Sequence, residues 1–376
     1  MDNNTISELT TKYRRDLHSI PELGFHENET GKYIRNILSQ LNCTIEPVIE
    51  TGLAAFFDFG QEKTLAFRGD MDALPIQEAT GLPFASKHDG VMHACGHDGH
   101  MANLLGFAHV LDELLQSGAH VPFNGLLIFQ PAEEIIDGAR SVCETDLLDR
   151  YNVKNVYGLH LWPMLEKGAV SSRPGPMMAR STEVNVDIEG LSAHCGQPEK
   201  GRDALLAGCR FVNDIYSFRE NEISDPGLIS FGKMHSGNVR NAISPATRIE
   251  GSMRTFYERT WKAMTDKMLD IGNSLKTDLG VHVSVDFSKG HQSVMNDEKL
   301  YQKIRPALMK LDYLEMEEPV MIAEDFSFFQ RKRPGVFFFL GTGSGIPLHS
   351  DTYTFDEDVL EHGVRLFEKL FLFADQ

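Results

Sequence analysis

The sequence predicts an α/β fold in which a larger domain is interrupted by a smaller α+β insert. Up to about residue 175, short apolar segments typical of buried strands alternate with helical patterns, as in a layered α/β domain. A segment rich in proline and glycine, 172–176, ends this alternation. Half-exposed strands and amphipathic helices follow, and buried elements return in the last part of the chain.

Four apolar segments in the first part have the length and composition of strands that are buried on both faces. Between the second and third lies a helical pattern, 101–116, whose apolar side chains recur on one face. The expected strands are 53–59, 64–68, 125–130 and 153–161. Together these elements predict a first domain part that spans residues 1–177.

The insert is expected to span residues 178–289, a length close to that of a typical domain. Its expected elements are strands at 183–188, 246–256 and 281–287 and an amphipathic helix at 203–218. Residues 290–376 are then expected to rejoin the first sheet. Their expected elements are helices at 298–311 and 357–373 and a buried strand at 335–341.

Three of the strands in the first part are followed by chemically active side chains. Asp70 and Asp72 follow the second strand, Glu133 and Glu134 follow the third, and His160 lies at the end of the fourth. In open α/β sheets, ligands bind beyond the carboxyl ends of the strands. We therefore expect these side chains to converge on one site.

Composition limits the classes of partner. The 376 residues carry a net charge of −18 at pH 7, which argues against nucleic acid. No apolar segment approaches the ~20 residues of a membrane helix, and the N-terminus lacks the basic and apolar parts of a secretory signal. The five cysteines are odd in number and scattered, which favours a reducing cytoplasm. We expect a cytoplasmic protein that binds neither nucleic acid nor membranes.

The segment from His93 to His100 contains three imidazoles, a thiol and a carboxylate. Thiolate and neutral imidazole are ligands that suit zinc, nickel, cobalt or manganese. A structural zinc site would normally need a second closely spaced pair of Cys or His, and the sequence contains none. The segment therefore predicts half of a catalytic metal site, with Cys95 and His97 as ligands that distant residues complete.

Glu133 and Glu134 are candidates for the acidic part of this site. Adjacent carboxylates on a loop point in different directions, so one can bind metal while the other takes a proton from the attacking water. His160 and His349 are the candidate imidazole ligands from the fourth strand and from a late loop.

Other interpretations remain open at this point. Cys95 could be a buried free thiol in a metal-free histidine cluster, or a nucleophile paired with histidine, although a nucleophile leaves the acidic pair unexplained. Asp70 and Asp72 could act by orienting an imidazole. The segment from His26 to Thr30 begins like the zinc motif His-Glu-x-x-His but ends in threonine, so it predicts no metal site.

Five motifs occur in an order that resembles a known family. They are Arg15 to Leu23, Arg68 to Pro75, Cys95 to Asp98, Gln130 to Glu134, and Glu324 to Phe326. Together they resemble the dinuclear metallo-amidohydrolases related to aminoacylase and glutamate carboxypeptidase. The subgroup most similar contains hippurate hydrolases, auxin-conjugate hydrolases and N-acetyldiaminopimelate deacetylases, and the resemblance covers nearly the whole chain.

The resemblance implies a discontinuous catalytic domain, with a mixed sheet flanked by helices, and an inserted lid that dimerises. It implies two divalent metal ions (Mn, Zn, Co or Ni) and Glu133 as the general base. The metal ligands that it implies are Cys95, His97, Glu134, His160 and His349. Cys95 would bridge the two ions, since it stands where many relatives outside this subgroup have a bridging Asp.

In the insert, the resemblance assigns His194 to the oxyanion of the tetrahedral intermediate and Asn241 and Arg254 to the substrate carboxylate. The expected reaction is hydrolysis of the amide of a small N-acyl amino acid, with N-acetyldiaminopimelate as one suggested substrate. A dipeptidase or carboxypeptidase with the same metals, and a binding protein without turnover, are the alternatives.

Overall fold

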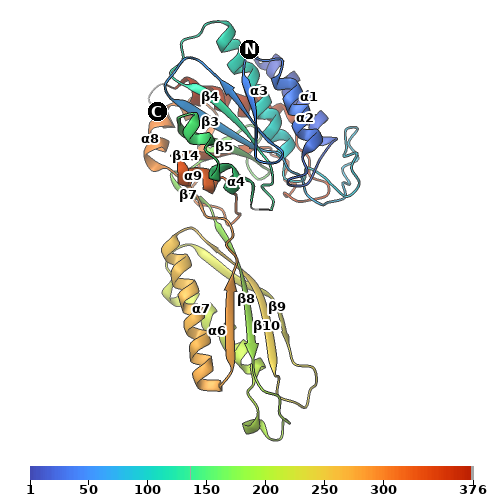
Figure 1. The fold of residues 1–376 in the computed structure, drawn as a ribbon, viewed down its shortest axis with the longest axis vertical. Coiled ribbons are helices and arrows are strands. Elements are labelled where there is room, and N and C mark those ends of the chain that lie inside the picture. Colours follow the sequence, from blue (N-terminus) through green and yellow to red (C-terminus); the bar gives the residue numbers. More distant parts are fainter. Residues whose placement is uncertain (136, 374–376) are drawn as a thin grey trace. The chain divides into compact units, whose positions relative to one another are not determined.

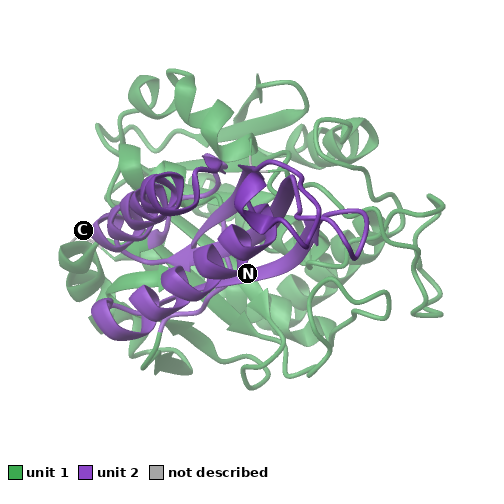
Figure 2. Cartoon of the chain, turned by 90° about the horizontal axis from the view of Figure 1, so that it is seen from below, with its two compact units in different colours: residues 1–177, 295–318, 325–376 green, residues 178–294, 319–324 purple. Residues whose placement is uncertain are grey.

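The computed structural model describes residues 1–135 and 137–373, which form two compact units (Figure 2). The first unit contains Met1–Met177, Met295–Glu318 and the chain from Asp325 onward. The second contains Met178–Val294 and Pro319–Glu324. The second unit thus continues beyond the predicted boundary at residue 289 and takes in a short segment of the returning chain.

A mixed sheet of eight strands organises the first unit, in the order β1-β2-β4-β3-β5-β14-β6-β13. The strands are β1 Thr44–Val48, β2 Gly52–Phe57, β3 Thr64–Asp70, β4 Asn124–Gln130, β5 Val153–Trp162, β6 Val170–Ser172, β13 Tyr313–Glu315 and β14 Gly335–Gly341. The central four, β4, β3, β5 and β14, are parallel, while β1 and β2 pair antiparallel. The carboxyl ends of the central strands therefore meet at one edge.

Helices cover both faces of this sheet (Figure 1). Phe67 of β3 packs against Phe107 and Phe367 on one face, whereas Arg68 bonds to Asp325 on the other. One group of helices is α1 Asn3–His18, α2 Asn28–Leu38, α3 His97–Gln116 and α10 Leu360–Leu372. The other is α4 Gly138–Glu144, α5 Leu147–Arg150 and α9 Ser327–Lys332. Every residue of β3 is buried, as expected for a parallel strand covered on both sides.

The second unit has an antiparallel sheet in the order β11-β8-β10-β9. Its strands are β8 Arg180–Glu189, β9 Gly227–Ser236, β10 Ala246–Thr255 and β11 His282–Phe287, and its helices are η1 Pro198–Lys200, α6 Ala204–Glu222 and α7 Glu258–Leu279. Because α6 and α7 pack on one face, buried and more exposed residues alternate along β8. This arrangement confirms the predicted α/β class with an α+β insert.

Several elements differ from the sequence prediction. Helix α3 begins at His97 rather than residue 101, so half of the His93–His100 segment is helical. The predicted helix 298–311 is α8 Glu298–Leu308, and the predicted helix 357–373 begins as the short turn η2 Glu357–Val359 before α10. The prediction omitted several elements, among them α1, α2, α7 and β9, which present a polar face and lack a continuous apolar segment.

A two-stranded sheet joins the places where the chain leaves and re-enters the first unit. It pairs β7 Gly175–Met178 with β12 Val294–Asn296, and β7 begins within the Pro/Gly-rich segment 172–176 that the sequence analysis identified. Among the described residues, none of the helices has the combination of length and apolarity that crossing a bilayer requires.

Candidate metal centre

The candidate site begins at the carboxyl edge of the parallel strands. Strand β3 ends at Asp70, β4 at Gln130 and β5 two residues after His160. The loops that follow these strands carry the other predicted acidic residues. The predicted convergence of strand ends is therefore present in the first unit.

Gly96 connects the cysteine to the helix that carries the first histidine. Its backbone is left-handed, with φ 87°, and a Cβ there would lie 3.2 Å from Leu161 Cδ1 and 3.3 Å from Tyr353 Oη. Glycine adopts the left-handed conformation without strain and has no Cβ to contact these neighbours. The turn places Cys95 and His97 on either side of Gly96, at the N-terminus of α3.

The predicted ligand atoms form two groups that share the cysteine. One is Cys95, His97 and His160, and the other is Cys95, Glu134 and His349; within each group the ligand atoms lie within 4.8 Å of one another. Cys95 Sγ is 3.4 Å from His160 Nε2, and His349 Nε2 is 3.4 Å from Glu134 Oε1. The structure thus brings together all five predicted ligands, in an arrangement that fits two cations sharing one thiolate.

The hydrogen bonds of the two buried histidines leave one ring nitrogen of each directed to the site. His160 Nδ1 lies 2.7 Å from the carbonyl oxygen of Leu161, and His97 Nδ1 lies 2.9 Å from that of Asp72. Because a carbonyl only accepts, each Nδ1 carries a hydrogen, and Nε2 is the nitrogen that offers a lone pair when the ring is neutral. Within the described residues, the buried His97 Nε2 has no hydrogen-bond partner. This is the pattern of imidazoles that ligate metal through Nε2.

His100 serves the site in a different way. The backbone N–H of Leu161 donates to His100 Nε2 at 2.9 Å, so the ring hydrogen is on Nδ1, which donates to Asp70 Oδ1 at 2.6 Å. The other oxygen of Asp70 accepts from Arg68 and lies 3.6 Å from His97 Nε2. Both nitrogens of His100 are therefore engaged, and Asp70 lies beside an imidazole as the sequence analysis expected.

The carboxylate of Asp72 holds the acidic loop. Oδ1 accepts from the backbone N–H of Glu133 and Oδ2 from that of Glu134, both at 3.0 Å. The closest contact of Asp72 to the His97 ring is made by its backbone oxygen, with Oδ1 at 3.5 Å from Nδ1. Asp72 thus links the imidazole to the two glutamates.

Burial and the nearby carboxylates set the protonation of the site. Burial and the charges of Glu134 and Glu133 raise the pKa of the Cys95 thiol. Burial alone would lower the pKa of His97, but Asp70 and Asp72 outweigh it and raise it to about 10. Burial and the neighbouring His100 lower the pKa of His160, which stays neutral. The excess of buried acidic groups favours bound cations, which would in turn stabilise the thiolate.

A buried ionic network, which the sequence analysis missed, ties the strand ends together. Arg68 donates to Asp325 Oδ1 at 2.6 Å and to Gln130 Oε1 at 2.7 Å, and Gln130 Nε2 donates to Asp325 Oδ2 at 2.8 Å. Arg68, Gln130 and Asp325 belong to three of the five motifs listed above. The pairing with Asp325 could not be inferred because it joins segments more than 190 residues apart.

The second unit carries the remaining predicted residues. His194 is exposed in the loop after β8, and its Nδ1 accepts from the N–H of Gly196 at 3.0 Å. The backbone of Cys195 bonds to that of Asn241, so these two loops lie side by side beyond the end of the sheet. Arg254 is half-buried near the opposite end of β10, eight residues from Ala246. Because a strand rises about 3.4 Å per residue, roughly 27 Å separates these ends, and one small carboxylate cannot contact both Asn241 and Arg254 of one copy.

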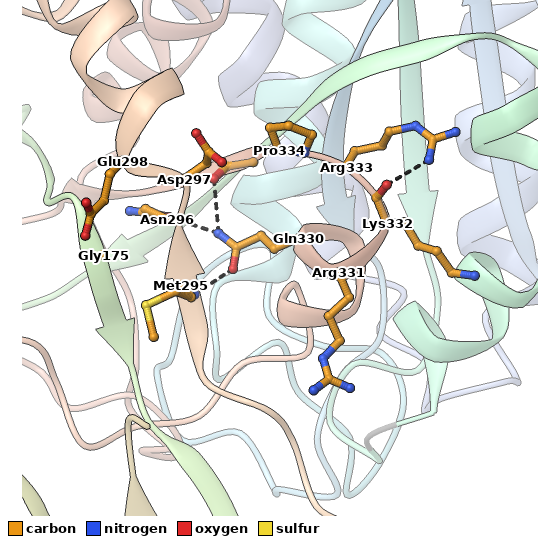
Figure 3. Close-up of a pocket in the computed structure, with 11 residues that line it drawn as sticks. Gly175, Met295, Asn296, Asp297, Glu298, Gln330, Arg331, Lys332, Arg333 and Pro334 are labelled. Atoms are coloured by element: carbon orange, nitrogen blue, oxygen red, sulfur yellow. Dashed lines mark hydrogen bonds between the residues drawn. The ribbon is translucent and has the colours of Figure 1, made fainter. Parts of the chain in front are cut away.

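A hollow of about 500 Å³ lies elsewhere in the first unit, between the start of α8 and the end of α9 (Figure 3). Gln330 in its wall donates to Asn296 Oδ1 at 3.0 Å and accepts from the N–H of Met295 at 2.7 Å. The described residues that line it include none of the predicted ligands. The side chain of Gln330 is bonded to Met295 and Asn296 of β12, so its polar groups have a structural role. The metal centre therefore remains the candidate site.

Comparison with known proteins agrees with this geometry. The model of peptidase family M20/M25/M40 matches residues 66–372. An uncharacterised hydrolase from Staphylococcus aureus is 34% identical over 374 residues, 96% of this chain and 97% of the relative. An N-acetyldiaminopimelate deacetylase from Lactobacillus acidophilus is 35% identical over 370 residues, 93% of this chain and 94% of the relative.

A solved structure supports the same assignment. A dinuclear metal-binding peptidase of family M20 from Bacillus subtilis has a TM-score of 0.86 at 31% identity, and the match covers 99% of each chain. The fold, the paired ligand groups and these relatives agree over nearly the whole length. The chain therefore belongs to peptidase family M20/M25/M40 and is a metal-dependent hydrolase.

Proposed function

We propose that this hydrolase cleaves the amide bond of small N-acyl amino acids, N-acetyl derivatives foremost, releasing a carboxylate and a free amino group. The observation that carries the proposal is the position of Glu133. It is buried, beside His97 and Glu134 and within 4.8 Å of their ligand atoms. The name of the deacetylase relative favours an acetyl group, and N-acetyldiaminopimelate is the first individual substrate to test.

The proposed site holds two divalent ions, chosen from Mn, Zn, Co and Ni. Cys95, His97 and His160 would hold one, and Cys95, Glu134 and His349 the other. When bound, the ions polarise the amide carbonyl and lower the pKa of the attacking water. Asp70 and Asp72 hold the ring of His97 and the acidic loop in place.

The protein residues would manage the protons and the substrate. Glu133 would take the proton of the attacking water and deliver it to the leaving nitrogen. His194 would donate a hydrogen bond to the carbonyl oxygen as negative charge develops there. Arg254, which keeps guanidinium hydrogens beyond those bonded to Ser181 and Ser252, would bind the substrate carboxylate.

A substrate panel tests the proposal. Metal-depleted protein would be reloaded separately with Mn, Zn, Co and Ni and assayed on N-acetyl-, N-benzoyl- and N-succinyl-amino acids and on dipeptides. We expect the highest kcat/KM on an N-acyl amino acid, and inhibition by a chelator that added metal reverses. Faster cleavage of dipeptides would favour the peptidase alternative, which the Bacillus relative's description suggests. No turnover in any metal would contradict the proposal.

We further propose a homodimer formed through the second unit. Strand β9 lies at the edge of its sheet, and exposed apolar side chains occur on it and on the neighbouring loop and helix. They include Leu191, Leu205, Leu206, Leu228 and Met234. A second copy would cover this surface and pair the open strand. It would also allow Asn241 and Arg254 of different copies to serve one substrate.

The proposed compartment is the reducing cytoplasm. All five cysteines are free thiols, and Cys95 can ligate metal only while it is reduced. Loss of activity on oxidation, restored by a thiol reductant, would support this assignment, and activity that is insensitive to oxidants would count against it.

A further inference from the structure

Three successive amides of the loop after β4 are held by carboxylates from distant parts of the chain. The N–H of Ala132 donates to Glu27 Oε1 at 2.9 Å, and those of Glu133 and Glu134 donate to Asp72 at 3.0 Å. All three donors and both acceptors belong to the first unit. The path of the acidic loop therefore depends on two carboxylates, of which Glu27 has no role in the site as described so far.

Ala132 has an unfavourable backbone conformation at the point where the loop turns. Its φ is 57°, in the left-handed region that residues with a Cβ rarely adopt, and it is completely buried. A Cβ at the facing Gly24 would lie 3.1 Å from Ala132 Cα, so the turn is closely packed. Such a conformation persists only where surrounding contacts hold it. It sets the direction in which Glu133 and Glu134 leave β4.

The carboxylate of Glu27 is directed to this loop rather than to its own helix. Glu27 is completely buried before α2, and its side chain makes no cap hydrogen bond to that helix. The first amides of α2, those of Glu29 and Thr30, donate instead to Glu22 Oε2 at 2.8 and 2.9 Å. Glu27 Oε2 accepts from Thr51 Oγ1, which leaves Oε1 aligned on Ala132.

We propose that Glu27 is a positioning residue that holds Ala132 in its left-handed conformation and thereby aims Glu133 and Glu134 at the metal centre. The effect on catalysis rests on the proposed function, in which Glu133 is the base. The effect on the loop does not, because it depends on the hydrogen bond alone.

Hydrogen exchange of the metal-free protein tests the loop directly. Glu27→Met removes the acceptor at similar volume, and Glu27→Gln keeps an oxygen for Ala132. Asp112→Leu is the matched control, since Asp112 is a buried carboxylate that accepts from the N–H of Asn42 in another loop. We expect amides 132–134 to exchange at least tenfold faster in Glu27→Met, slightly faster in Glu27→Gln and at the wild-type rate in Asp112→Leu. Wild-type exchange in Glu27→Met would overturn the proposal.

Steady-state kinetics test the consequence. In saturating metal we expect Glu27→Met to lower kcat by about 10- to 100-fold, the scale of a small misplacement of a catalytic group, with KM within about twofold of wild type. Adding Ala132→Gly to Glu27→Met should recover part of kcat, because glycine adopts positive φ freely. Because Ala132→Gly would also stabilise a merely destabilised protein, kcat is compared at a temperature where every variant is fully folded. If Glu27→Met does not fold, the kcat of Glu27→Gln is compared with that of Glu27→Gln combined with Ala132→Gly.

The outcomes separate the two proposals. If wild type cleaves no amide in any metal while Glu27→Met still speeds exchange, the proposed function fails and the positioning role stands. If wild type is active and Glu27→Met matches it in kcat, Glu27 has no positioning role in catalysis.

Discussion

Glu133 and Glu134 are neighbours whose backbone amides share one carboxylate, yet their surroundings differ. Glu134 Oε1 lies 3.4 Å from His349 Nε2 and belongs to the group that contains Cys95. Glu133 is grouped with His97 and Glu134 but not with Cys95 and His349. This difference supports the proposed roles of Glu133 as base and Glu134 as ligand.

Glu133→Gln should therefore retain metal while kcat falls by about 10²- to 10⁴-fold, the usual contribution of a general base. Glu134→Gln should instead lose metal, because an amide is a weaker ligand than a carboxylate. Elemental analysis and kcat of both variants check this, with the exposed Glu29→Gln as control. Full activity in Glu133→Gln would refute its assignment as base.

Cys95 belongs to both ligand groups, whereas His349 belongs to one. Cys95→Ser should therefore reduce the content of both metal ions, and His349→Ala should leave close to one ion per chain. Cys43→Ser, at a cysteine whose thiol bonds to the backbone of Leu38, serves as the control and should keep both. Equal loss of metal in Cys95→Ser and His349→Ala would show that the thiolate does not bridge.

At the scale of elements, the N-terminus of α3 joins the metal centre to the sheet. Gly96 has positive φ and is crowded by Leu161 and Tyr353, while Gly118, just past the other end of α3, has φ 65° and open space around it. Both positions strain any other residue, but crowding applies to Gly96 alone of the two. Substitutions at Gly96 and Gly118 therefore distinguish the effect of backbone strain, which both share, from the effect of crowding beside the metal ligands, which only Gly96 shows.

Gly96→Ala should weaken metal binding at least tenfold, since left-handed strain and the contacts with Leu161 and Tyr353 both act on the turn that joins Cys95 to His97. Gly118→Ala should cost about 1 kcal/mol of stability from left-handed strain and leave metal affinity unchanged. Metal titration together with thermal unfolding of both variants gives the comparison. The explanation fails if the two variants bind metal alike.

Helix α1 is bound to the start of α3 by a buried ionic network. His18 Nδ1 lies 2.8 Å from Asp98 Oδ2 and its Nε2 lies 3.3 Å from Glu78 Oε1, while Arg14 donates to the same oxygen of Asp98 at 2.9 Å. Burial opposes the charged ring, but Asp98 and Glu78 outweigh it and raise the pKa of His18 to about 9. The protonated ring of His18 therefore links α1 to α3 and to the loop that contains Glu78.

This network predicts a loss of stability at alkaline pH. Because the folded pKa of His18 lies above its ordinary value of 6.5, its contribution is complete below pH 6.5 and is lost as the pH rises through about 9. The shift corresponds to roughly 3 kcal/mol. The Tm advantage of metal-free wild type over His18→Gln should shrink from pH 6.5 to pH 10. A constant difference would exclude a charged His18.

At the scale of the whole molecule, the exposed apolar surface of the second unit predicts association. Leu206 on α6 and Leu269 on α7 are similarly exposed, at 48% and 46%, but Leu206 lies with the proposed dimer surface beside β9. Leu206→Glu should shift wild-type dimers to monomers in analytical ultracentrifugation, and Leu269→Glu should not. A monomeric wild type, or dimers in both variants, would contradict the proposed interface.

The sequence alone determined the α/β class, the insert after the Pro/Gly-rich segment, and the residue types of the metal centre. These properties depend on local features of the sequence. The spacing of apolar residues indicates which faces are buried, and several Cys and His residues within one short segment indicate metal ligands. The motif from Gln130 to Glu134 added one more ligand, whereas His160 and His349 lie outside the five motifs and were candidates from a strand end and a late loop.

The tertiary structure decided what each residue contacts. Glu27 belongs to a segment that the sequence analysis set aside as a failed zinc motif, yet its carboxylate bonds to Ala132, over a hundred residues away. In the same way Arg68 meets Asp325, and His100 bonds to Asp70 instead of facing a ligand group with Cys95. No pattern along the chain encodes such pairs, because they arise only when strand order and helix packing bring distant segments to the same edge of the sheet.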